Sequence, residues 1–212
     1  MTVLLTGFEP FAGDGTNPSG AAVRLVEAAW DRPEQLIVDV LPVEFEAAAT
    51  RLRTLIAEHQ PSVVIAVGLA GGRAAIGVER VALNLIDARI ADNSGAQPID
   101  VASVEGAPVA RFATLPVKAV AEAIREVGIA AEVSHSAGTF VCNHVFYSAM
   151  DATASHPRVR AGFIHVPWNT EDAPAGVASI PLADIARSVR RAIDITLDPD
   201  ASEPRTSAGT VA

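Results

Sequence analysis

Aliphatic segments of strand length alternate with segments of helical periodicity along almost the whole chain. The extended segments are expected at residues 3–6, 36–43, 62–67, 76–85, 131–134 and 162–166. Helices are expected at residues 18–30, 44–59, 117–127, 141–155 and 182–197. Strands interleaved with helices form a largely parallel sheet that is covered on both faces. We therefore expect an α/β fold, a single-domain three-layer α/β/α sandwich with a mostly parallel, mixed central sheet.

Length and composition fit one domain of this kind. A chain of 212 residues can bury one substantial core but not two large ones. Half of the residues are hydrophobic and only 5% are aromatic, which is typical of near-continuous aliphatic strands. We expect one domain over residues 1–198 and a small, polar, disordered tail over residues 199–212.

Charge and cysteine content exclude several classes of function. The formal net charge of −9 argues against binding to a nucleic-acid backbone, which requires clustered cations. The sequence has no apolar stretch long enough to span a bilayer, and its start lacks the features of a signal peptide. One cysteine excludes an internal disulfide and a multi-cysteine zinc site. We expect a soluble, acidic, cytoplasmic protein that binds neither nucleic acid nor membranes.

The loops at one edge of the expected sheet hold the candidate functional residues. In open α/β sheets, ligands bind at the carboxyl ends of the strands. The loops at residues 7–20, 68–73 and 137–142 fall at this edge, and His165 ends the strand at residues 162–166.

Cys142 is the only cysteine of the chain, and glycine and small polar residues precede it just before a helical pattern begins. A thiol at a helix N-terminus has its thiolate favoured by the helix dipole, which promotes nucleophilic reactivity. Most free cysteines are nevertheless small buried hydrophobes, so Cys142 alone does not decide between these interpretations.

A cysteine nucleophile needs a base, and His165 is the best placed of the five histidines. A satisfied core histidine is an equally good interpretation of its position alone. His144 points away from Cys142 on the same helix and suits packing, whereas His59 and His156 suit solvated positions. His135 follows a strand and stays open as an alternative.

Glu79 could orient the base, since a buried carboxylate needs a partner. From the residues alone, however, a solvated strand face with Glu79 paired to Arg80 is the favoured interpretation. Arg89 could stabilise an anion, although surface ion pairing is its simplest explanation. Phe8 and Phe11 either cover a core edge or form the walls of a small apolar pocket. The glycine loops match neither phosphate-binding pattern well.

Five parts of the sequence carry a family resemblance: VLLTGFEPFAGDGTNPSG, GLAGGR, VERVALN with DARIADN, SHSAGTFVCNHVFYSAMD and GFIHVPW. Together they resemble the pyroglutamyl peptidase I family of cysteine peptidases, also called pyrrolidone-carboxylate peptidases. The segments follow the family's order and spacing over nearly the whole chain up to the last helix. The cysteine segment alone is highly specific.

The resemblance implies a catalytic triad of Cys142, His165 and Glu79 that releases pyroglutamate from peptide N-termini. It also implies an oxyanion site formed by the Cys142 backbone N–H and the Arg89 side chain. Phe8 and Phe11 would sandwich the lactam ring, with Leu69 and Val141 as further substrate contacts. Neither a metal nor an organic cofactor is expected.

The sequence departs from the family at Leu69, where the family usually has glutamine. The resemblance implies a main-chain contact to the lactam at this position, so leucine would preserve binding but leave the fine substrate preference open. The resemblance also implies a homo-oligomer, often a tetramer.

Two alternative functions use related scaffolds. A nucleoside-phosphorylase-like transferase would need a basic phosphate site, for which the glycine loops offer only Arg73. A non-catalytic small-molecule or peptide binding protein is the other alternative, and the presence of every proposed catalytic residue weakens it.

Overall fold

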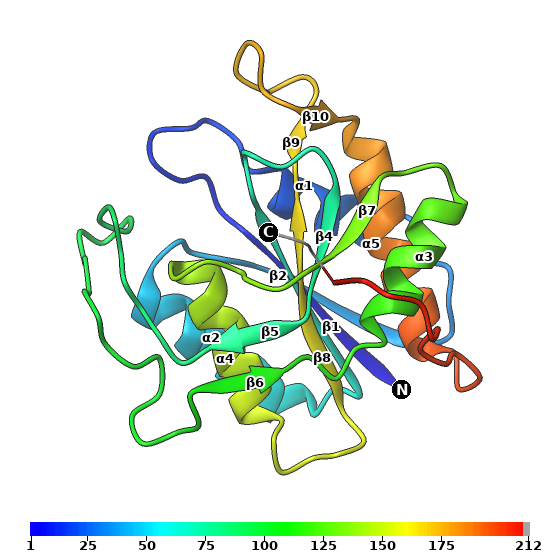
Figure 1. Ribbon diagram of the computed structural model, residues 1–212, viewed down its shortest axis with the longest axis horizontal. Coiled ribbons are helices and arrows are strands. Elements are labelled where there is room, and N and C mark those ends of the chain that lie inside the picture. The colour runs from blue at the N-terminus through cyan, green and yellow to red at the C-terminus, as the bar shows by residue number, and fades with distance from the viewer. Residues whose placement is uncertain (210–212) are drawn as a thin grey trace.

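A six-stranded sheet in the order β2-β1-β3-β8-β4-β7 forms the centre of the computed structural model, which describes residues 1–209 (Figure 1). Its strands are β1 (Thr2–Phe8), β2 (Gln35–Leu41), β3 (Val63–Leu69), β4 (Ile76–Glu79), β7 (Ala131–Ser134) and β8 (Arg160–Val166). Every neighbouring pair is parallel except β4 with β8, which is antiparallel. The predicted α/β class with a mixed, mostly parallel sheet is confirmed.

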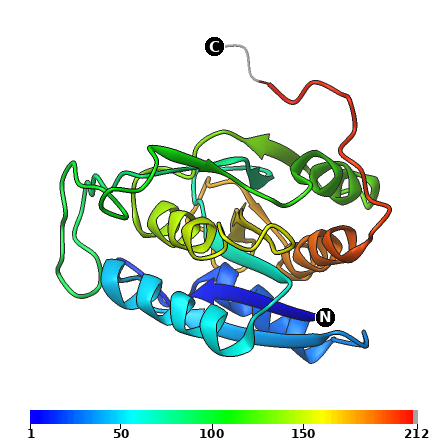
Figure 2. The same ribbon diagram turned by 90° about the horizontal axis from the view of Figure 1, so that it is seen from below.

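Helices cover both faces of the sheet, as Figure 2 shows from the side. The helices are α1 (Pro18–Ala28), α2 (Phe45–His59), α3 (Val117–Glu126), α4 (Val141–Ala152) and α5 (Leu182–Leu197). Contacts join α1 and α3 to α5 on one face and α2 to α4 on the other. No helix among residues 1–209 combines the length and the apolar character needed to cross a membrane.

Alternate residues of the central strands supply two hydrophobic cores. In β1, Val3 and Leu5 pack with the residues of α1, α3 and α5, whereas Leu4 packs with those of α2 and α4. In β3, Ile65 likewise packs in the core on the α1, α3 and α5 side, whereas Val64 packs in the core on the α2 and α4 side. Burial on both faces explains why these strands are almost uninterrupted aliphatic runs.

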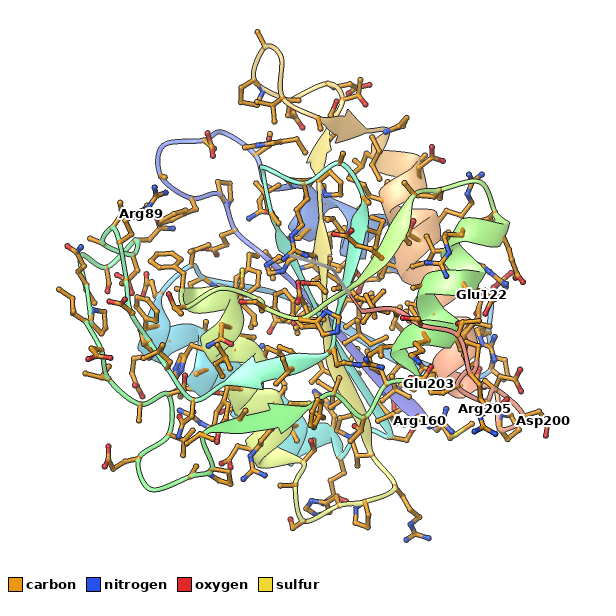
Figure 3. The ribbon with its side chains drawn as sticks, in the orientation of Figure 1. Arg89, Glu122, Arg160, Asp200, Glu203 and Arg205 are labelled. Atoms are coloured by element: carbon orange, nitrogen blue, oxygen red, sulfur yellow. The ribbon has the colours of Figure 1, made fainter. Side chains whose placement is uncertain are left out.

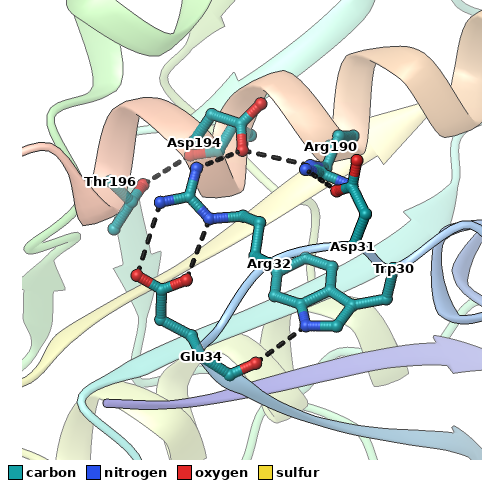
Figure 4. Close-up of polar contacts among 8 residues, drawn as sticks. Trp30, Asp31, Arg32, Glu34, Arg190, Asp194 and Thr196 are labelled. Carbon is teal, nitrogen blue, oxygen red and sulfur yellow. Dashed lines mark hydrogen bonds and ion pairs between the residues drawn. The ribbon is translucent and has the colours of Figure 1, made fainter.

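Ion pairs fasten α5 to the turn that follows α1 (Figure 4). Arg190 contacts Asp31 at 2.6 Å, and its guanidinium lies 4.9 Å from the centre of the Trp30 ring. Arg32 contacts Asp194 at 2.9 Å and Glu34 at 3.0 Å. This network is at the opposite end of α1 from the loop with Phe8 and Phe11.

Short strands complete the fold. The extended run expected at residues 76–85 breaks at Arg80 into β4 and β5 (Val81–Leu83). β5 pairs with β6 (Ala110–Phe112), and β9 (Trp168–Asn169) pairs with β10 (Ser179–Ile180). β6, β9 and β10 were not expected, because two or three residues are too few to establish an alternating pattern.

The segment after α5 contacts α3. The Glu203 carboxylate accepts hydrogen bonds from the backbone N–H groups of Lys118 and Ala119 at 2.9 and 3.1 Å. It lies beside the first turn of α3 (Figure 3), which has no side-chain cap of its own. The domain boundary at residue 198 and the disorder expected after it stay predictions, and residues 210–212 lie outside the described part.

Candidate active site

Cys142 is the second residue of α4, as the sequence predicts. Gly138, at φ 77°, turns the chain before the helix, and Phe140 is the extended N-cap residue. The first backbone N–H groups of a helix have no intrahelical partner, so this position places free donors beside the sulfur.

The surroundings of Cys142 nevertheless oppose the thiolate. Burial and the nearby Glu79 carboxylate raise the pKa of Cys142 to about 12, while Arg73 acts in the opposite direction. The helix start favours the thiolate as expected, but burial and Glu79 outweigh it. A nucleophile at this position needs a base that removes its proton.

His165 and Glu79 form the buried pair that such a base requires. His165 Nδ1 lies 2.7 Å from Glu79 Oε1, and the two residues are 4% and 0% exposed. Gly77 of β4 lies opposite His165 of β8, so Glu79 is the diagonal neighbour on the same face of an antiparallel pair. Long side chains reach across such diagonals.

The interpretation of Glu79 as a solvated residue paired with Arg80 is wrong. Arg73 is its cationic partner, with Nη1 at 2.9 Å from Oε1. Strand alternation does not reveal this burial, because β4 lies inside the sheet and residues on both of its faces are covered.

A small cavity brings together the cysteine, the histidine and the apolar residues singled out from the sequence. Its volume is about 260 Å³, at the small end of ligand sites, which suits a single ring. The lining residues are Phe8, Phe11, Asp14, Thr16, Asn17, Val43, Leu69, Ala137, Phe140, Val141, Cys142 and His165. The same cavity is thus lined by Phe8, Phe11, Leu69, Val141, Cys142 and His165.

Phe140 is a cavity residue that sequence reasoning missed. Its ring lies 5.2 Å from that of Phe11 and 5.0 Å from that of Phe45. The sequence feature that points to Phe140 as a site residue is its position inside the cysteine segment, one residue before α4.

Asn17 and Ser19 hold the loop between β1 and α1 in place. Asn17 Oδ1 accepts from the Ser19 backbone N–H and hydroxyl, and Asn17 Nδ2 donates to the Glu9 carbonyl. The Ser19 hydroxyl oxygen accepts from the Phe8 N–H at 3.1 Å. The expected helix cap at Asn17 and Pro18 is confirmed, and it fixes the loop with the two phenylalanines.

Arg89 lies on the loop that follows β5 and is exposed (Figure 3). It is not among the described residues that line the cavity. Asn93 lies on the same loop as Arg89. Its side-chain amide donates to the Pro10 carbonyl at 3.0 Å and so connects this loop to the β1–α1 loop. The oxyanion role of Arg89 stays a prediction.

The other histidines are separate from the cavity. His135 and His156 are exposed, and His59 lies at the end of α2. His144 is buried against Phe45, and burial, with the nearby Arg53, lowers its pKa to about 4. His144 is therefore a neutral packing residue, as expected from the helix geometry.

Comparison with known proteins identifies one family. The family model for pyroglutamyl peptidases matches residues 1–198. The chain is 54% identical to the pyrrolidone-carboxylate peptidase of Clavibacter michiganensis over 172 residues, 81% of each protein. It is 49% identical to that of Cupriavidus taiwanensis over 200 residues, which cover 92% of this chain and 93% of the relative.

Solved structures agree with the sequence relatives. Pyroglutamyl peptidase I from Bacillus amyloliquefaciens is 44% identical with a TM-score of 0.85, covering 90% of this chain and 94% of that one. Pyrrolidone carboxyl peptidase from Thermococcus litoralis is 36% identical with a TM-score of 0.91, covering 97% and 99%. The chain belongs to the pyroglutamyl peptidase family of cysteine peptidases.

Proposed function

We propose that Cys142, His165 and Glu79 are the catalytic triad with which this chain hydrolyses the bond after an N-terminal pyroglutamyl residue. As a member of the pyroglutamyl peptidases, the chain removes N-terminal pyroglutamate from peptides. The observation that carries the triad is the buried 2.7 Å contact between His165 and Glu79. The same histidine lines a cavity together with the only cysteine.

The reaction has two halves. His165 takes the proton of the Cys142 thiol as the sulfur attacks the pyroglutamyl carbonyl carbon. The C–N bond then breaks, and the imidazolium gives its proton to the leaving amine, which leaves a thioester on Cys142. His165 next deprotonates a water molecule that attacks the thioester, so pyroglutamate departs and the thiol is restored.

Glu79 acts through His165. Its carboxylate holds Nδ1 protonated, which leaves the other ring nitrogen free to accept the thiol proton. The negative charge also stabilises the imidazolium that forms during the attack. This arrangement compensates for an environment in which burial raises the pKa of Cys142.

The oxyanion would be held by the Cys142 backbone N–H and the Arg89 guanidinium. The backbone donor is supported by its place in the first turn of α4. Arg89 is exposed and makes no side-chain hydrogen bond within residues 1–209, so its donors are available for developing charge.

The cavity walls suit an uncharged lactam. Phe8, Phe11 and Val141 provide apolar surface around the cavity. A pyroglutamyl ring carries no charge, so no cation is needed to bind it. Leu69 occupies the wall at the end of β3, where the family's usual glutamine is absent, and we expect it to contact the ring through its main chain.

Substrate selectivity and thiol protection test this proposal together. Fluorogenic amides of pyroglutamate, proline and glutamate are compared at equal concentration with and without added phosphate. We expect release from the pyroglutamyl amide alone, independent of phosphate, and protection of Cys142 from iodoacetamide by 2-pyrrolidone. Equal release from the prolyl amide, a requirement for phosphate, or unprotected alkylation would contradict the proposed site.

We also propose that the protein is cytoplasmic and assembles as a homo-oligomer. The large apolar residues Ile99, Val109 and Phe112 support assembly, since they are 65%, 88% and 70% exposed.

The phosphorylase alternative needs a cation at the glycine loops that is free to bind phosphate. The cation that these loops offer is Arg73, and its guanidinium is already hydrogen-bonded to Glu79.

A further inference from the structure

Glu79 is a fully buried carboxylate, and its two oxygen atoms differ in their hydrogen-bond partners. Oε1 contacts both His165 Nδ1 and Arg73 Nη1, whereas Oε2 has no hydrogen-bond partner within residues 1–209. A buried charge is costly unless it is paired and hydrogen-bonded. Arg73 is the permanent cation among the described contacts of Glu79, so it is the group that balances the carboxylate.

Arg73 connects this carboxylate to the segment that carries the nucleophile. Nη1 donates to Glu79 Oε1 at 2.9 Å, and Nη2 donates to the Ser136 carbonyl at 3.0 Å. Ser136 belongs to the loop that leads into α4 and Cys142. A rigid guanidinium fork can hold two such acceptors at once, which a single ammonium group cannot reproduce with the same geometry.

Gly77 makes room for this contact. It lies opposite His165 in the β4–β8 pair, and a Cβ added to it would collide with Arg73 Nη1. The guanidinium therefore occupies the side-chain space of the residue facing the proposed base. Arg73 is only 26% exposed and is not among the described residues that line the cavity, so its described side-chain contacts are with Glu79 and Ser136.

We propose that Arg73 is a positioning residue of this active site, which keeps Glu79 aimed at His165 and ties it to the loop before Cys142. The proposal deepens the proposed function and rests on the same triad. The charge of Arg73 has a second effect on the site. Burial and Glu79 raise the pKa of Cys142, and the Arg73 cation partly opposes them by lowering it.

Kinetics and thiol reactivity of matched variants test the proposal. For Arg73→Ala we expect kcat to fall roughly 10- to 100-fold, as when other supporting residues are lost, with KM within about threefold. Arg73→Lys should recover part of kcat. Arg80→Ala is the matched control, since the Arg80 side chain makes no described hydrogen bond to Glu79.

Iodoacetamide alkylation at pH 9 separates positioning from a merely structural role. Below the thiol pKa the alkylation rate follows the thiolate fraction, so removing a neighbouring cation should slow Cys142 roughly tenfold in Arg73→Ala. Glu79→Gln should change the rate in the opposite direction. Arg80→Ala should leave the alkylation rate unchanged.

Unchanged kcat in Arg73→Ala, or a lower kcat with a wild-type alkylation rate, would overturn the proposal. If Arg73→Ala does not fold, Gly77→Ala is the variant to measure, because the added methyl group displaces the Arg73 guanidinium. A wild-type kcat in Gly77→Ala would also overturn the proposal. Absence of pyroglutamyl hydrolysis by the wild-type protein would instead refute the proposed function, and the alkylation rates would still decide the role of Arg73.

Discussion

At the scale of single residues, two glycines flank His165 and make the site possible. Gly68 of β3 and Gly77 of β4 both lie opposite His165 in their strand pairs. A Cβ on Gly68 would lie 2.9 Å from Cys142 Sγ and 2.8 Å from Phe163 Cζ. The absence of side chains on both sides leaves room for the sulfur on one side and for Arg73 on the other.

Gly68→Ala should therefore impair the reaction, because the methyl group would push the Cys142 sulfur away from its present position beside Gly68. A displacement of about 1 Å costs on the order of 100-fold in rate, and kcat for a pyroglutamyl amide is the measurement. Gly72→Ala is the control, since a Cβ there meets no atom within 4 Å. Equal kcat in both variants would show that Gly68 does not set the sulfur position.

Glu79→Gln should lower kcat roughly 10³- to 10⁴-fold, as expected when an orienting carboxylate loses its charge. KM should change little, because Glu79 is not among the described residues that line the cavity. Steady-state kinetics and thermal unfolding of the same preparation give the two readouts. A variant that unfolds but keeps its rate when folded would assign Glu79 a structural role.

The sequence could predict part of this site. Cys142 and His165 could be found because a helix start and a strand end identify them. The burial of Glu79 could not be derived from its neighbours, and the family resemblance alone pointed to it. The Arg73 contact depends on how the loop after β3 folds back over Gly77, which local pattern does not encode.

At the scale of elements, Asp92 fastens the loop after β5 to the rest of the molecule. Oδ1 accepts from the Ser94 N–H, the Ser94 hydroxyl and the Ala96 N–H, and Oδ2 accepts from the Phe45 N–H at the start of α2. Burial opposes ionisation, but these hydrogen bonds outweigh it and hold the pKa of Asp92 below its usual value. The loop that carries Arg89 is thereby held against α2.

Asp92→Asn should destabilise the protein by about 1–3 kcal/mol at pH 7, because an amide group cannot accept all four hydrogen bonds. A lowered folded pKa means that this stabilisation is present above the unfolded value, about 3.9, and is lost as the pH falls through the folded pKa. Urea unfolding from pH 7 to pH 3 should show the difference shrinking, with Asp87→Asn as control. A difference that does not depend on pH would contradict the ionised state of Asp92.

Among elements, long periodic segments were predictable and short ones were not. Helix α5 and strand β7 have the predicted bounds, because their amphipathic or aliphatic patterns are uninterrupted. The two-residue strands β9 and β10 owe their existence to tertiary pairing. The reversed direction of β4 relative to β8 also follows from the connections rather than from the residues of β4.

At the scale of the whole molecule, the sheet order gathers the site from distant parts of the chain. Parallel β3 and β8 bring Leu69 and His165 to the same edge, and antiparallel β4 reaches His165 from the other side. Segments separated by more than a hundred residues therefore meet in one small cavity.

The proposed homo-oligomer can be tested at the exposed apolar residues on and beside β6, Val109 and Phe112. Light scattering should give the wild-type protein a mass that is a multiple of 22.0 kDa. Phe112→Glu should shift the population toward the monomer, because a charge on this surface opposes its burial. A wild-type protein at 22.0 kDa would contradict the proposed homo-oligomer.

The most direct measurement is the hydrolysis rate of a fluorogenic pyroglutamyl amide by the wild-type protein and by Cys142→Ala. We expect turnover in the wild type and none above background in the variant, with the same thermal unfolding midpoint for both. Comparable turnover by the folded Cys142→Ala variant would contradict the assignment of this sulfur as the nucleophile.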